Sequence, residues 1–148
     1  MELKQIKQAA FKILARREYS RVELARKLQQ KFAGTDPELI QAAIEQLISK
    51  NFQNDQRYAE AMVRHRASQG YGPAYIRQLL KQQGVSDQES RAALAAAQID
   101  WQALAQQHYL KHFGGKPIRD FKERAKRMRY LYSRGFLQEI INTLLGED

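Results

Sequence analysis

The chain has 148 residues and no cysteine, so disulfides, cysteine-ligated zinc, iron–sulfur clusters and thiol chemistry are excluded. Its formal net charge of +9, from 25 lysines and arginines against 16 aspartates and glutamates, indicates an acidic partner such as nucleic acid or a protein bound to it. Because no apolar run is long enough for a membrane span and no leader-like segment follows Met1, we expect a cytoplasmic protein.

Helical segments are predicted along the whole chain, because strand-forming residues are scarce: it has three valines and two threonines. Glycines and prolines fall where the apolar periodicity breaks, and Pro37, Pro73 and Pro117 each suit the first turn of a helix. The nine predicted helices lie near residues 3–17, 20–32, 36–50, 54–69, 72–83, 86–98, 100–113, 117–134 and 136–145.

One aromatic-turn-helix phrase occurs three times, at Tyr19, Tyr71 and Phe136. In each copy, leucine or isoleucine follows the aromatic residue at +5 and +9. This is the spacing of a hydrophobic staple, in which the residue before the N-cap packs on the fourth helical residue. In the first copy, Ser20 and Glu23 complete a capping box. The repetition predicts an all-α protein whose tandem three-helix repeats form an elongated array that can curve.

The short connections predict that neighbouring helices pack locally into three units, at residues 1–52, 53–99 and 100–148. In the third unit the phrase joins the second and third helices, whereas in the other two it joins the first and second. Either a change of register or an inserted helix at 100–113 explains this difference.

No arrangement typical of an active site occurs: the sequence lacks a Ser-His-Asp order, a Walker loop and a Gly-x-Gly-x-x-Gly motif. His108 and His112 lie one helical turn apart, which is a metal-ligand spacing. With no cysteine and no carboxylate on that turn, a structural role is favoured. We therefore predict no enzymatic activity, no metal and no cofactor.

Positive charge concentrates in residues 1–31, with nine basic and three acidic residues, and in residues 118–134, with seven and two. In the second segment, basic residues recur at i, i+3 and i+7, opposite an apolar stripe of Phe121, Met128 and Leu131. Such a basic face can bind phosphates or acidic side chains, or it can simply be solvated. The candidates for nucleic-acid or acidic-surface binding are Arg119, Lys122, Arg124, Lys126, Arg127 and Arg129.

A second charged row, Arg57, Glu60 and Arg64, lies on one face of the predicted helix 54–69. It suits pairing within the helix and docking on another protein equally well. Tyr71 and Tyr75 could stack bases, but the staple spacing of Tyr71 favours a place in the core.

A resemblance to the RecX family, bacterial regulatory proteins of the RecA recombinase, is carried by residues 55–66 (DQRYAEAMVRHR) and 70–80 (GYGPAYIRQLL). The first unit, with RREYS at 16–20 and LARKL at 24–28, is similar to the family's N-terminal repeat. The resemblance covers nearly the whole chain. It is looser in the third unit, where Leu137 stands in place of a good N-cap.

This resemblance implies three tandem three-helix repeats, no enzymatic activity, and binding along the groove of the RecA–single-stranded DNA filament. It implies limits on filament growth, ATP hydrolysis, strand exchange and co-protease activity, and so a role in DNA repair, recombination and the SOS response. The alternative is an autonomous basic helical DNA- or RNA-binding protein. We expect a monomer, because no heptad run occurs, with naked DNA as a weaker partner. On charge and predicted exposure, the candidate filament contacts are Arg57, Arg64, Arg66, Arg77 and Lys81.

Overall fold

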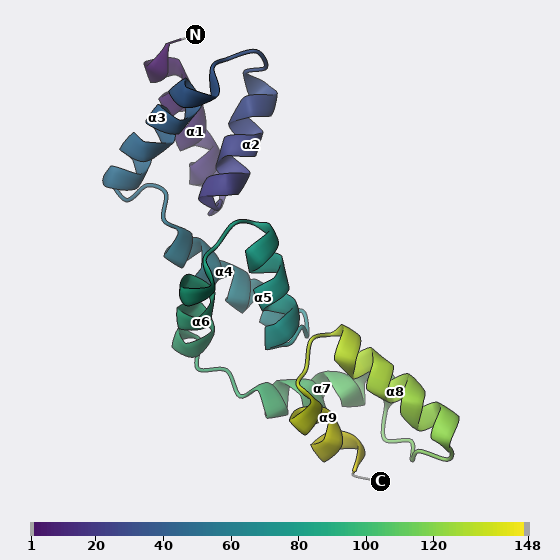
Figure 1. Ribbon diagram of the computed structural model, residues 1–148. Helices are drawn as coiled ribbons and strands as arrows, with labels where there is room; N and C mark the ends of the chain where they lie inside the picture. The colour runs from purple at the N-terminus through teal and green to yellow at the C-terminus, as the bar shows by residue number, and fades with distance from the viewer. Residues whose placement is uncertain (1, 147–148) are drawn as a thin grey trace.

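The computed structural model describes residues 2–146, so Met1 and residues 147–148, which belong to the predicted outer units, lie outside the described residues. Within residues 2–146 the chain forms nine helices and no strand, as predicted, and they follow one another along an elongated molecule (Figure 1). The helices are α1 (Leu3–Arg16), α2 (Arg21–Lys31), α3 (Pro37–Ser49), α4 (Asp55–Ser68), α5 (Pro73–Gln82), α6 (Asp87–Ala96), α7 (Trp101–Phe113), α8 (Phe121–Ser133) and α9 (Gln138–Leu145).

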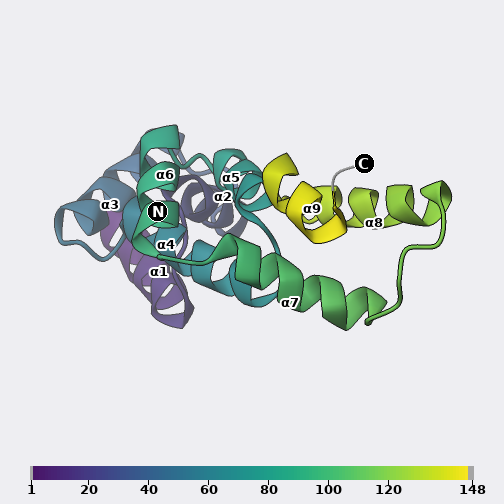
Figure 2. The same cartoon turned by 90° about the horizontal axis from the view of Figure 1, so that it is seen from below.

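The start of α8 is the one helix end that the sequence misplaced by more than two residues. The prediction put Pro117 in its first turn, and this is wrong: Pro117 lies in the α7–α8 loop. The helix begins after Asp120, whose carboxylate accepts a hydrogen bond from the backbone N–H of Glu123 at 2.8 Å. An aspartate at the N-cap satisfies an otherwise unpaired helix donor, so it fixes the start of α8 more strongly than an upstream proline. Figure 2 shows the α7–α8 loop at the outer end of the third unit, away from the other helices.

The thrice-repeated phrase forms the predicted staple in every copy. Its aromatic residue directly precedes the N-caps of α2, α5 and α9, which are Ser20, Gly72 and Leu137. The residues at +5 are fully buried, and they are Leu24, Ile76 and Ile141. Ser20 and Glu23 also form the predicted capping box. The sequence pattern therefore sets both the entry of each of these helices and its inward face.

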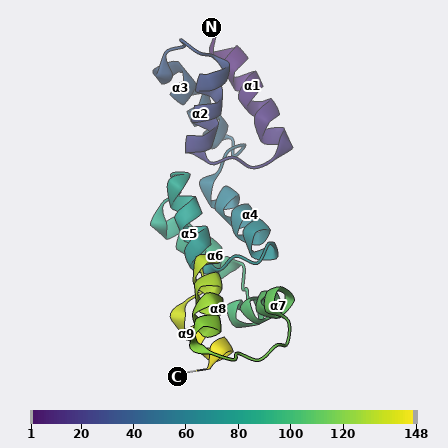
Figure 3. The same cartoon turned by 90° about the vertical axis from the view of Figure 1, so that its right-hand side faces the viewer.

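Each group of three helices has its own hydrophobic core, and the three groups are stacked along the molecule (Figure 3). The most extensive helix–helix contacts all join helices of the same group. Trp101 and Leu104 pack against both the second and the third core, so they link these two groups. This arrangement agrees with tandem three-helix repeats, while the boundaries at 52/53 and 99/100 stay a prediction.

The second and third groups meet through the turns of their repeated phrases. The backbone N–H of Gly72 donates to the carbonyl of Arg134 at 2.6 Å, and that of Ala74 donates to the carbonyl of Gly135 at 3.1 Å. The Arg134 guanidinium lies over the Tyr71 ring, 3.8 Å from its centroid. The two turns approach so closely that a Cβ atom at Gly72 would lie 2.5 Å from the Gly135 carbonyl oxygen.

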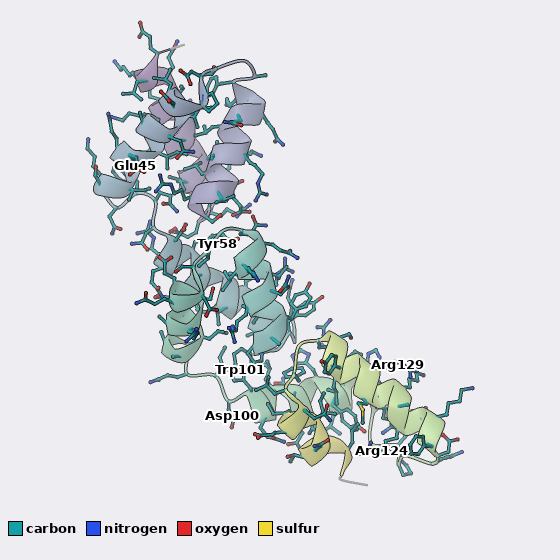
Figure 4. The ribbon with its side chains drawn as sticks, viewed as in Figure 1. Glu45, Tyr58, Asp100, Trp101, Arg124 and Arg129 are labelled. Atoms are coloured by element: carbon teal, nitrogen blue, oxygen red, sulfur yellow. The ribbon has the colours of Figure 1, made fainter. Side chains whose placement is uncertain are left out.

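The first and second groups meet through a polar network instead. The backbone N–H of Arg21 donates to the Asp55 carboxylate at 2.8 Å, and the Gln53 side chain donates to the Tyr19 carbonyl at 3.1 Å. Tyr58, which Figure 4 places at this junction, is 2% exposed. Burial, reinforced by the Glu23 carboxylate, raises the pKa of the Tyr58 phenol, so this hydroxyl stays neutral.

We expect Gly135→Ala to lower the free energy of unfolding by about 2 kcal/mol, because the new methyl group opens the joint between the second and third groups. Gly135 has a φ of +93°, and its Cβ would lie 2.4 Å from the Tyr75 backbone nitrogen. Gly34→Ala is the matched control, since Gly34 has a φ of +87° and no atom within 4 Å of its Cβ position. Gly34→Ala should lower the free energy of unfolding by about 1 kcal/mol, because only the positive φ disfavours alanine there. Urea unfolding measures both variants, and equal losses of unfolding free energy would contradict a close contact between the second and third groups.

Candidate functional site

A basic hollow lies where the α7–α8 loop meets the first turns of α8. Its volume is about 590 Å3, and six of its nine lining residues are basic whereas two are acidic. Helical spacing after the Asp120 cap places successive basic side chains on one face of α8. The hollow brings together five of the six residues that the sequence predicted for this segment, all but Arg124. The lining residues are Lys116, Pro117, Arg119, Asp120, Lys122, Glu123, Lys126, Arg127 and Arg129.

Four of the predicted cations in the basic hollow are exposed, and none of them forms an ion pair within residues 2–146. They are Arg119, Lys122, Lys126 and Arg129. Arg124 is half-buried, and its guanidinium donates to the carbonyl of Gly146 near the end of α9. Figure 4 marks Arg124 and Arg129 along α8. The four exposed cations can therefore meet phosphate or carboxylate groups directly.

Arg127 lines the same hollow but is a buried residue, only 3% exposed. Its guanidinium donates to the Tyr109 hydroxyl at 2.7 Å, the Lys116 carbonyl at 3.0 Å and the Glu123 carboxylate at 3.0 Å. These bonds fasten the α7–α8 loop and α7 to α8. Because Arg127 is buried and bonds through Nε and one terminal nitrogen inside the protein, its charge is not open to a partner as those of the four exposed cations are.

The structure adds Lys116 and Phe121 to this region. Phe121 is 86% exposed, so its predicted place in the apolar stripe with Met128 and Leu131 is wrong. Met128 and Leu131 do pack in the third core. Phe121 is the first residue of α8, where the helix overhangs its neighbours, and helical periodicity carries no information about that overhang. An exposed aromatic ring beside lysines is typical of single-strand stacking surfaces.

The candidates on α4 and α5 do not form one uniform surface. Arg77 and Lys81 line a second hollow of about 410 Å3, and Arg77 donates to the Asp87 carboxylate at 2.9 Å. Arg91 and then Arg77 hold the pKa of Asp87 below its usual range. Arg64 is exposed on α4, whereas Arg66 is half-buried and donates to the Gln69 side chain at 2.9 Å.

Arg57 lies at the joint between the first and second groups. Its Nε donates to the Glu18 carboxylate at 2.7 Å, and its two terminal nitrogens donate to the carbonyls of Asn51 and Phe52, each at 3.1 Å. The charged row that the sequence places on this helix is thus divided: Arg57 ties two groups together, and Arg64 faces solvent.

We expect Arg57→Met to lower the free energy of unfolding by about 1–2 kcal/mol, since it removes an ion pair that is about one third exposed and two hydrogen bonds to carbonyls. Arg64→Met makes the same chemical change at an exposed position of the same helix, and we expect an effect within about 0.5 kcal/mol. Urea unfolding followed by circular dichroism measures both. A larger loss for Arg64→Met would contradict the structural role of Arg57.

The two histidines of α7 take part in packing. The His112 ring stacks on Tyr130 with 4.0 Å between ring centroids, and His108 lies against Gly70 in the α4–α5 turn.

Among residues 2–146, no three metal-ligating side chains gather, and no helix is long and apolar enough to cross a membrane.

Sequence models of the three RecX domains match three parts of this chain in order. The first three-helix domain matches residues 7–47, the second matches residues 54–94, and the third matches residues 98–145. The chain is 42% identical over 144 residues to Regulatory protein RecX of Pseudomonas fluorescens strain SBW25, covering 97% of this chain and 92% of the relative. It is 41% identical over 141 residues to Regulatory protein RecX of Pseudomonas syringae pv. tomato, covering 95% and 90%.

Two solved structures share the fold. The crystal structure of RecX from Lactobacillus salivarius superposes with a TM-score of 0.75 at 22% identity, over 97% of this chain and 94% of that chain. A second crystal structure, of regulatory protein RecX, gives a TM-score of 0.82 at 21% identity, over 98% and 72%.

Proposed function

Because the chain belongs to the RecX family of regulatory proteins, we propose that it is a non-enzymatic modulator of the RecA recombinase. It binds along the groove of the RecA filament on single-stranded DNA. There it limits filament growth, ATP hydrolysis, strand exchange and co-protease activity. The proposal includes a cytoplasmic location, a monomeric state, and a role in DNA repair, recombination and the SOS response.

The observation that carries this proposal is the free positive charge of the basic hollow at one end of an elongated array. Four exposed cations that form no ion pair within residues 2–146 present a surface to which phosphates or an acidic protein face can bind. An elongated row of helical groups can follow a groove over several subunits, because each group contacts the next through a small joint. Arg64 and Lys81 supply further exposed positive charge in the middle group, where Arg77 is paired with Asp87.

The test is the rate of ATP hydrolysis by RecA on single-stranded DNA, measured as the protein is added up to equimolar amounts. We expect a progressive fall in the rate. An unchanged rate across that range would overturn the proposal.

A second candidate function, an autonomous nucleic-acid-binding protein, is favoured by Phe121, whose exposed ring beside Lys122 could stack a base. It predicts tight and strongly salt-dependent binding to naked single-stranded DNA. Fluorescence anisotropy with a labelled oligonucleotide separates the two functions. Weak binding to naked DNA, together with inhibition of RecA, supports the first.

A further inference from the structure

The first helical group carries an exposed pair of phenylalanines that the basic hollow does not involve. Phe11 on α1 and Phe52 after α3 are 48% and 44% exposed, and their rings meet edge to face with 5.1 Å between centroids. Together with Leu47 they form the apolar floor of a hollow of about 540 Å3. We call this hollow the phenylalanine site.

The backbone holds Phe52 in place. The N–H of Phe52 donates to the Leu47 carbonyl and that of Asn51 to the Ile48 carbonyl, both at 2.9 Å, and Asn51 has a φ of +61°. These bonds are the Schellman ending of a helix, which brings the side chain of Phe52 against Leu47. The floor of the phenylalanine site is therefore preformed, so little conformational entropy is lost when a ligand binds.

Four lysines and no acidic residue surround this floor. Lys4, Lys7 and Lys12 lie on α1, and Lys50 caps the end of α3. Within residues 2–146 none of the four forms an ion pair. An apolar floor with an unneutralised positive rim complements a ligand that combines carboxylates with an apolar side chain.

We propose that the phenylalanine site binds an acidic peptide segment, which packs an apolar side chain on Phe11 and Phe52 and sets its carboxylates against the lysines. The floor favours a peptide over nucleic acid. A base buried there would meet the apolar surfaces of Phe11, Phe52 and Leu47, and its polar edges would lose hydrogen bonds to water. A leucine or phenylalanine side chain carries no such cost.

The test uses the full chain alone, so its outcome is independent of RecA. The probe is a fluorescein-labelled peptide of about 12 residues, rich in aspartate and glutamate, with leucine and phenylalanine one helical turn apart. A second peptide has serine at both apolar positions, and a third has asparagine and glutamine at the acidic positions. We expect the first peptide to bind at least about tenfold more tightly than either of the others.

Two variants locate the binding. Phe11→Ser should weaken peptide binding about tenfold, whereas Leu110→Ser, at a position 47% exposed on α7, should not. Lys12→Glu should weaken it about tenfold, whereas Lys27→Glu, an equal charge change at an exposed position of α2, should change it less than about threefold. Thermal melting of each variant checks that the fold is retained.

Three results would overturn the proposal. One is the absence of binding by the first peptide at millimolar concentration. Another is equal weakening by Lys12→Glu and Lys27→Glu, which would show attraction by net charge only. The third is a labelled oligothymidylate that binds more tightly than the peptide and is weakened by Phe11→Ser, which would assign the site to nucleic acid.

Discussion

The double variant Lys122→Glu with Lys126→Glu is expected to weaken inhibition of RecA about 30-fold and to leave the melting temperature nearly unchanged. Both side chains are exposed in the basic hollow, one turn apart on α8, and neither forms an ion pair within residues 2–146. Reversal removes two favourable contacts with phosphate or carboxylate and replaces them with repulsion. Within residues 2–146 the reversal breaks no ion pair, so the fold should tolerate the change.

The matched control is Lys27→Glu with Lys31→Glu, which reverses two exposed lysines at the same spacing on α2. Inhibition of RecA-dependent ATP hydrolysis is measured as the protein concentration that halves the rate. If phosphates are the contacts, the salt dependence of filament binding should also fall, by about 1.4 in the slope of log K against log salt. Equal weakening by the control pair would mean that net charge, and not the basic hollow, governs binding.

Arg127→Met is expected to lower the free energy of unfolding by about 3 kcal/mol, the largest loss among the substitutions considered. The variant leaves the buried Tyr109 hydroxyl without its donor, and it removes the partly buried hydrogen bond to the Lys116 carbonyl. The Glu123 carboxylate, about one third exposed, loses less because water can reach it. The α7–α8 loop should loosen as a consequence.

Arg129→Met is the control for this prediction, since Arg129 is exposed two residues further along α8. We expect it to change stability by less than about 0.5 kcal/mol. Trp101, the single tryptophan of the chain, packs against both the second and the third core, so its fluorescence during urea unfolding reports on the third group together with its joint to the second. Similar losses of unfolding free energy for both variants would contradict a structural role of Arg127. An Arg127→Met variant that keeps its full stability but no longer inhibits RecA would contradict it as well.

Local chemistry allowed most of the fold to be predicted. The staple at Tyr19 and Leu24, the capping box of Ser20 and the nine helices depend on residues within a few positions of one another. The error at Pro117 is also a local one. Pro117 and Asp120 both favour a helix start and lie three residues apart, and the helix begins after Asp120 because its carboxylate accepts a hydrogen bond from a helix N–H.

The sequence predicted the helices better than it predicted which side chains of α8 are exposed. Helical spacing gave Phe121 and Leu131 the same apolar face, but α8 extends past its neighbours, so one ring is exposed and the other side chain is buried. Likewise Arg127 and Lys126 are adjacent in sequence and similar in charge. Only the position of α7 decides that one is bonded to Tyr109 while the other faces solvent.

The sequence by itself determined the helices, their tandem three-helix order, the excess of positive charge and the resemblance to RecX, because each of these depends on composition or on local spacing. The tertiary structure decided which charged side chains form contacts inside the protein. Arg57 pairs with Glu18, 39 positions away, and Arg127 bonds Tyr109, 18 positions away. It also decided that Phe11 and Phe52 meet. Such contacts form only when separate helices pack, and helical periodicity within one segment carries no record of them.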